Sequence, residues 1–68
     1  MWTETLQKQT KEYFENNPIA MMKQFGTGKF GVCQLESDGI YYITVFKSDE
    51  VLAFETVEEL LTANWAID

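Results

Sequence analysis

The chain has 68 residues, with eleven acids against five lysines and a formal net charge of −6 at pH 7. It contains no histidine and no arginine, the residues that titrate near neutral pH without tuning and that clamp phosphates and carboxylates. A negative field repels nucleic acid and anionic lipid and favours basic proteins. The composition therefore predicts neither a nucleic-acid partner nor a membrane partner.

One domain, residues 1–68, accommodates the whole length. The lone cysteine, Cys33, cannot close an internal disulfide, and no Cys/His cluster could hold structural zinc. Hydrophobic residues make up 46% of the chain, so the fold has to rest on an apolar core, with dimerisation as another way to gain burial. No apolar run approaches the roughly 20 residues of a membrane span, and we expect a soluble, cytoplasmic protein.

Two helices are predicted ahead of the first strand. Residues 2–17 are good helix formers. The apolar residues near one face of this helix are Trp2, Leu6, Tyr13 and Phe14. Pro18 interrupts the helix, because a residue before proline is pushed out of the α region, and it suits the first turn of a new helix. The three-residue apolar spacing over residues 18–25 predicts a short second helix that Gly26 ends.

A hairpin follows. Residues 30–35 and 40–46 are rich in β-branched and aromatic side chains, which favours two strands. A three-residue loop with Gly39 in the left-handed conformation best separates the two faces. This register pairs Leu35 with Tyr41, Cys33 with Ile43 and Gly31 with Val45. A two-residue Asp-Gly turn is the alternative, and it separates the faces less well.

The last third of the chain predicts a strand and a helix. Residues 51–54 form a short apolar run, and residues 56–59 match a capping box. The following helix is expected to present Val57, Leu60, Leu61 and Trp65 on one side. The predicted fold is therefore α+β in two layers: a three-stranded antiparallel β-meander with two N-terminal helices and one C-terminal helix, in the order α-α-β-β-β-α.

Residues 26–31 spell the GxGxxG pattern of dinucleotide sites. In such sites the glycines follow a strand and open a helix whose N-terminus meets the phosphates. Here a helix is expected before the pattern and a strand after it, so we interpret the segment as a helix stop and a hinge. A small-ligand or nucleotide site formed by Gly26, Gly28, Lys29 and Gly31 is the alternative.

No catalytic, metal or cofactor site is predicted. Cys33 is expected on an inward strand face with no histidine to activate it, which is typical of a core cysteine. Turns and helix caps account for the neighbouring carboxylates. These are Glu36 with Asp38, Asp49 with Glu50, and Glu58 with Glu59. A hydrolase built on carboxylates is the least favoured hypothesis.

The second face of the predicted hairpin is too apolar to be left to water. Its residues are Phe30, Val32, Tyr42, Thr44 and Phe46. Either a helix of this chain covers them, or another molecule does. The leading hypothesis is a small non-enzymatic interaction or regulatory module that binds a protein partner, basic in character, or a second copy of itself through these five residues. Imitation of nucleic acid by clustered acids is a variant of it.

Overall fold

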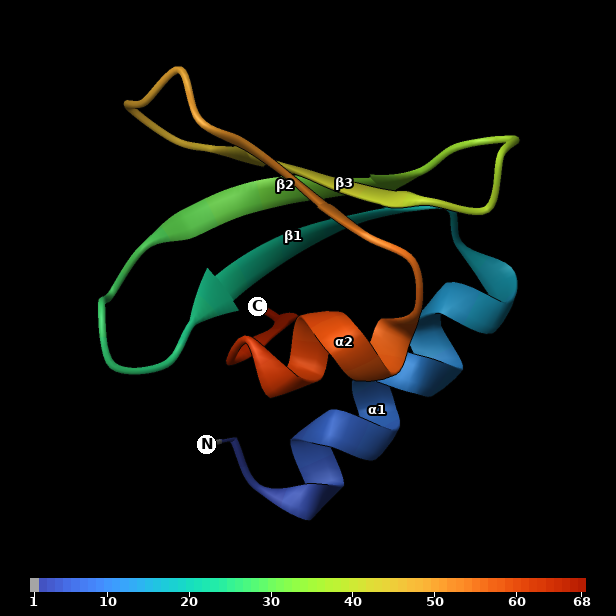
Figure 1. Ribbon diagram of the computed structural model, residues 1–68. Helices are drawn as coiled ribbons and strands as arrows, with labels where there is room; N and C mark the ends of the chain where they lie inside the picture. The colour runs from blue at the N-terminus through green and yellow to red at the C-terminus, as the bar shows by residue number, and fades with distance from the viewer. Residues whose placement is uncertain (1) are drawn as a thin grey trace.

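A five-stranded antiparallel sheet with two helices against one face makes up the fold, as a computed structural model of residues 2–68 describes it (Figure 1). The elements are α1 (Glu4–Asn16), β1 (Ile19–Gln24), β2 (Phe30–Leu35), β3 (Tyr41–Val45), β4 (Val51–Phe54), α2 (Val57–Thr62) and β5 (Trp65–Ile67). The strand order is β4-β3-β2-β1-β5. Strands β1 to β4 form a meander, and β5 returns to pair with β1. The α+β class is confirmed, but the predicted three-stranded α-α-β-β-β-α arrangement is wrong.

The predicted second helix over residues 18–25 is strand β1. Its residues pair antiparallel with β2, with Met22 opposite Gly31 and Ala20 opposite Cys33. Ala20 and Met22 are buried, whereas Ile19 and Met21 between them are exposed. Both faces of this strand are thus apolar, and a short apolar run without alternation cannot be told from a helix by spacing alone.

The predicted C-terminal helix ends much earlier than its apolar pattern implied. Helix α2 stops at Thr62, and Trp65 lies in β5, where it pairs with Gln24 of β1. Asn64 has a left-handed backbone with φ of 71°, a conformation that ends helices and that asparagine tolerates better than most residues. The chain therefore leaves the helix there and enters the sheet.

The predicted hairpin and helix cap are both confirmed. Strands β2 and β3 pair Leu35 with Tyr41, Cys33 with Ile43 and Gly31 with Val45. Gly39 has φ of 82°, as the three-residue loop requires. The side chain of Thr56 accepts a hydrogen bond of 3.1 Å from the backbone N–H of Glu59, at the start of α2. These features depend on contacts between residues close in sequence.

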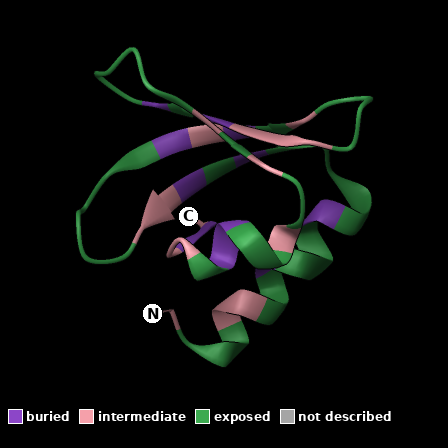
Figure 2. Cartoon of the chain, viewed as in Figure 1, coloured by how far each residue is buried: buried purple, intermediate pink, exposed green. Residues whose placement is uncertain are grey.

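The core lies between the sheet and the helices, where Figure 2 shows buried segments on both layers. The largest fully buried side chains are Trp65, Met22, Ile43, Leu60, Thr10 and Cys33. Gly31 also faces inward, and a Cβ atom there would lie 2.7 Å from the carbonyl oxygen of Thr44 and 2.9 Å from Cγ2 of Ile43. Only glycine fits this close approach between β2 and β3.

Helix α1 closes the β5 edge of the sheet. The hydroxyl of Thr10 accepts a hydrogen bond of 3.2 Å from the backbone N–H of Ile67 and donates one of 2.8 Å to the carbonyl oxygen of Leu6. The indole N–H of Trp2 donates to the carbonyl oxygen of Asn64 at 2.7 Å. The opposite edge strand, β4, pairs with β3 alone among the strands that the structure describes.

Candidate interaction surface

The face of the sheet opposite the helices carries most of the exposed apolar surface. We call it the outer face. Since Ala20, Met22, Cys33, Ile43 and Val45 are buried beneath the helices, the alternate residues of each strand point the other way. Five of the seven exposed large hydrophobic side chains lie on this outer face by strand alternation and pairing: Ile19, Met21, Phe30, Phe46 and Val51. The other two are Tyr13 on α1 and Phe25 in the turn after β1.

All five predicted interaction residues lie on the outer face. Phe30 is opposite Phe46, whose backbone N–H donates to the carbonyl oxygen of Phe30 at 2.9 Å, and the two side chains are 47% and 45% exposed. Val32 lies opposite Thr44, and Tyr42 lies opposite Gln34. Val32 and Tyr42 are half-buried. Both helices lie on the other side of the sheet (Figure 1). Neither helix of residues 2–68 covers this hairpin face, so the first of the two alternatives that the sequence left open does not apply.

Strand β1 enlarges this surface beyond the hairpin. Ile19 and Met21 belong to the outer face, and sequence reasoning missed them because residues 18–25 were predicted as a helix. Val51 of β4 was missed as well, since no partner strand fixed its direction. The signal that could have found β1 is the length of the segment, because seven residues between Pro18 and the glycine-rich segment suit a strand better than a helix.

Side-chain contacts hold the sheet at both of its ends. At the hairpin end, the Tyr42 hydroxyl donates a hydrogen bond of 2.9 Å to Oδ2 of Asp38. This bond raises the pKa of Tyr42 above its ordinary value, because it favours the protonated phenol. At the far end, the rings of Trp2 and Phe25 pack edge to face with centroids 5.2 Å apart. Lys23 Nζ lies 5.0 Å from the Trp2 ring centroid, within cation–π distance.

The negative charge is concentrated on the helical layer. Helix α1 and residues 55–59 contain six acids against two lysines. Residues 17–54, which form the meander, contain four acids and three lysines. Two of those lysines are paired with carboxylates: Lys29 Nζ lies 3.7 Å from Glu50, and Lys23 Nζ lies 3.8 Å from Asp68. The outer face is therefore close to neutral, and its rim is less acidic than the composition alone implied.

The glycine-rich segment forms the turn between β1 and β2. Gly26 and Gly28 have φ of 90° and 71°, and the backbone N–H of Gly28 bonds to Gln24, while that of Lys29 bonds to the hydroxyl of Thr27. These amides are occupied within the turn, and the segment connects two strands instead of opening a helix. Gly31 faces the core. Gly26, Gly28 and Lys29 of the alternative ligand site thus share this turn, whereas Gly31 lies in β2.

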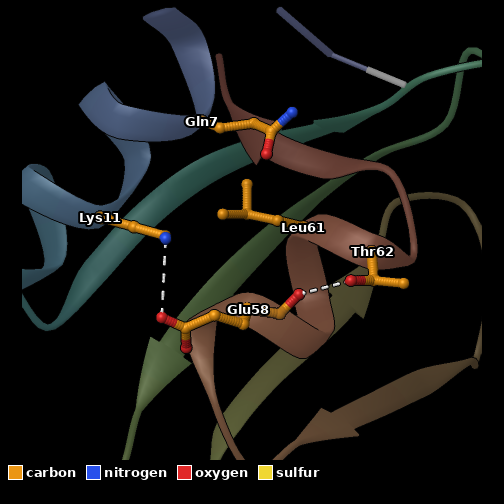
Figure 3. A pocket seen from close by; sticks show the side chains of 5 residues that line it. All are labelled: Gln7, Lys11, Glu58, Leu61 and Thr62. Carbon is orange, nitrogen blue, oxygen red and sulfur yellow. Dashed lines mark hydrogen bonds and ion pairs between the residues drawn. The ribbon is translucent and has the colours of Figure 1, made fainter. Parts of the chain in front are cut away.

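The remaining candidate features are the Cys33 thiol, the metal-ligating side chains and a hollow between the two helices. Burial raises the pKa of the Cys33 thiol to about 12, so it stays protonated at neutral pH. Residues 2–68 contain no group of three or more metal-ligating side chains. A hollow of about 140 Å³ lies between α1 and α2, and Lys11 and Glu58 form an ion pair of 3.6 Å there (Figure 3). Ligand pockets measure roughly 300–1,000 Å³, so this hollow is a crevice between helices.

Comparisons with known proteins add no relative. No family model, no curated protein and no solved structure matches the chain. Neither helix within residues 2–68 is long and apolar enough to cross a bilayer. The outer face is the feature on which a functional assignment can rest.

Proposed function

We propose that this protein is a non-enzymatic interaction module that works by burying its outer face against another protein surface, and that this surface is a second copy of the chain. The observation that carries the proposal is the placement of five of the seven exposed large hydrophobic side chains on one face. A contiguous exposed apolar patch of this kind marks interaction sites in proteins that are otherwise covered by polar groups.

The distribution of charge favours a second copy as the occupant. Two copies with a net charge of −6 each repel one another at long range. If the outer faces meet, the acid-rich helices of both copies point away from the interface, and the nearly neutral faces come together. Lys23 and Lys29 keep their carboxylate partners at the rim. This orientation keeps the acid-rich helices of the two copies apart.

The breadth of the molecule is compatible with a dimer interface. The Cα atoms of the whole chain extend over 29 × 28 × 16 Å, so the broad side of the molecule, loops included, measures about 800 Å², which is what each partner buries in a standard interface. Two antiparallel sheets pack face to face at about 10 Å with strands rotated by roughly 30°. The dimer would then be a four-layer sandwich with helices outside.

A cytoplasmic location belongs to the same proposal. The lone thiol of Cys33 has no cysteine to pair with inside the chain, which agrees with a reducing compartment. Basic proteins are the heterologous partners that the net charge would steer toward the dimer, because opposite fields raise association rates at low salt.

Phe46→Lys tests the proposed interface. Phe46 leaves 45% of its surface exposed, which for phenylalanine is roughly 90 Å² and is worth about 2 kcal/mol when buried. A symmetric dimer contains this ring twice, so we expect a loss of about 4 kcal/mol, near a thousandfold in the dimer dissociation constant. Sedimentation equilibrium should give a dimer for the native chain and a monomer for the variant, with unchanged circular dichroism.

Tyr13→Lys is the matched control. Tyr13 is the exposed large hydrophobic that lies on α1, away from the outer face, so this variant should remain dimeric. A native chain that stays monomeric at millimolar concentration would overturn the second copy as occupant. Turnover of a substrate by the pure chain would contradict the non-enzymatic assignment.

A further inference from the structure

Within residues 2–68, the chain covers the β5 edge of the sheet but not the β4 edge. At the β5 edge, the side chain of Thr10 binds the outward backbone N–H of Ile67, and α1 lies alongside. At the β4 edge, no described segment pairs with the strand on its far side. An uncovered edge presents backbone donors and acceptors to which another extended chain can pair.

The ladder identifies the backbone groups that are available. The N–H of Val45 donates to the carbonyl oxygen of Glu50 at 3.1 Å, so these two residues form a hydrogen-bonded pair. Bonded and non-bonded pairs alternate along an antiparallel ladder. The N–H and C=O groups of Val51 and Ala53 therefore point away from β3. Their side chains are exposed on the outer face.

Acidic residues stand at both ends of this edge. Asp49 and Glu50 precede β4, and Glu55 follows it. Among the described residues, Glu50 pairs with Lys29, whereas neither Asp49 nor Glu55 has a lysine within ion-pair distance. Self-pairing that sets Val51 opposite Ala53 of a second copy would place Asp49 opposite Glu55 at both ends. Like charges in directly opposed positions destabilise strand pairs.

We infer that β4 is a binding site for an extended segment of a partner protein that carries basic residues on both sides of a short run of alternating apolar side chains. The segment adds as a sixth strand, antiparallel to β4. It exchanges backbone hydrogen bonds with Val51 and Ala53, and its basic ends meet Asp49 and Glu55. The side chains opposite Val51 and Ala53 continue the outer face. The pairing itself uses the edge backbone of β4 and does not require the dimer, although the side chain of Val51 also belongs to the outer face.

A designed peptide tests the inference directly. The probe is Val-Thr-Val-Thr flanked by two lysines at each end, acetylated and amidated, and the control replaces every lysine with glutamate. Titration into the ¹⁵N-labelled full chain should shift and protect the amides of Val51 and Ala53. The lysine peptide should bind at least about tenfold more tightly than the glutamate peptide, and added salt should weaken it. No amide shift at millimolar lysine peptide, or shifts confined to other strands, would overturn the inference.

Ala53→Pro distinguishes backbone pairing at the β4 edge from non-specific binding to the apolar surface. Proline removes the outward N–H but leaves the β3 ladder intact, which edge strands tolerate. We expect a loss of about tenfold or more in peptide affinity, whereas Ala53→Val, which keeps the N–H, should bind as before. Equal binding by the proline variant would refute edge pairing.

A charge-swapped variant, Asp49→Lys with Glu55→Lys, provides a second route if the proline variant does not fold. It should reverse the preference and favour the glutamate peptide. A preference that stays with the lysine peptide would exclude the acidic ends as its cause.

Discussion

Replacing Thr10 with valine removes the hydroxyl that closes the β5 edge while keeping the branched shape of the side chain. Thr10 is fully buried. Its hydroxyl accepts a hydrogen bond from the Ile67 N–H and donates one to the carbonyl oxygen of Leu6. Threonine and valine have similar helix propensities, so α1 should form equally well in the variant. The change isolates one contact between the helix and the sheet.

The expected loss of stability comes from the backbone N–H of Ile67, which loses its hydrogen-bond acceptor in the variant. A buried N–H without a partner costs about 1–3 kcal/mol. The added methyl group of valine offsets part of this loss, because it buries more apolar surface. We therefore expect the free energy of unfolding to fall by about 1–2 kcal/mol. For a domain of this size, each kcal/mol lowers Tm by roughly 4–8 °C. Thermal unfolding followed by circular dichroism should therefore show a decrease of about 5–15 °C.

Hydrogen exchange distinguishes the lost bond from simple repacking. In Thr10→Val the amide of Ile67 should exchange faster relative to its neighbours. Thr10→Ser, which keeps the hydroxyl and loses a methyl group, should retain protection at Ile67 even if Tm decreases. A valine variant with native Tm and a protected Ile67 amide would refute the claim that this side chain closes the edge.

Two further predictions concern the core. Gly31→Ala should lower the free energy of unfolding by about 1–3 kcal/mol, measured by urea titration. The reason is that the Cβ atom of the new alanine would lie 2.7 Å from the backbone oxygen of Thr44. A neutral effect would show that β2 and β3 can separate at no cost. Cys33 ionises near 9 when unfolded and at about 12 when folded, so the unfolded state loses its proton first and stability should decrease as pH rises from 9 toward 12. The Tm difference between the native chain and Cys33→Ala should change over this range, and a constant difference would contradict a buried thiol.

The hairpin and its outer face could be predicted from sequence because their information is local. Gly39 fixes the loop, and the loop fixes which residues of β2 and β3 are opposite one another. Side chains alternate along a strand, so the same register places Phe30 and Phe46 on one face. The face on which Phe30 and Phe46 lie could therefore be inferred from a few residues that are close in the sequence. The molecule that binds them stays a prediction.

Strands β1 and β5 could not be predicted because their conformation depends on distant partners. Residues 19–24 are apolar on both faces, since one face meets the helices and the other belongs to the outer face. Residues 65–67 continue the apolar pattern of α2 and become a strand through pairing with β1. The left-handed Asn64 marks the change, but asparagine also occurs within helices. Tertiary pairing outweighed local spacing at both places.

Strand β5 joins the beginning of the chain to its end. Trp2 bonds to Asn64, and Thr10 bonds to Ile67, so these contacts span nearly the whole sequence. A nascent chain that has reached Asn64 contains α1, the meander and α2, but it lacks Trp65, a fully buried side chain of the core. Stable folding therefore has to wait until residues 65–67 have left the ribosome, and a chain truncated after Asn64 should yield a fragment that proteases remove.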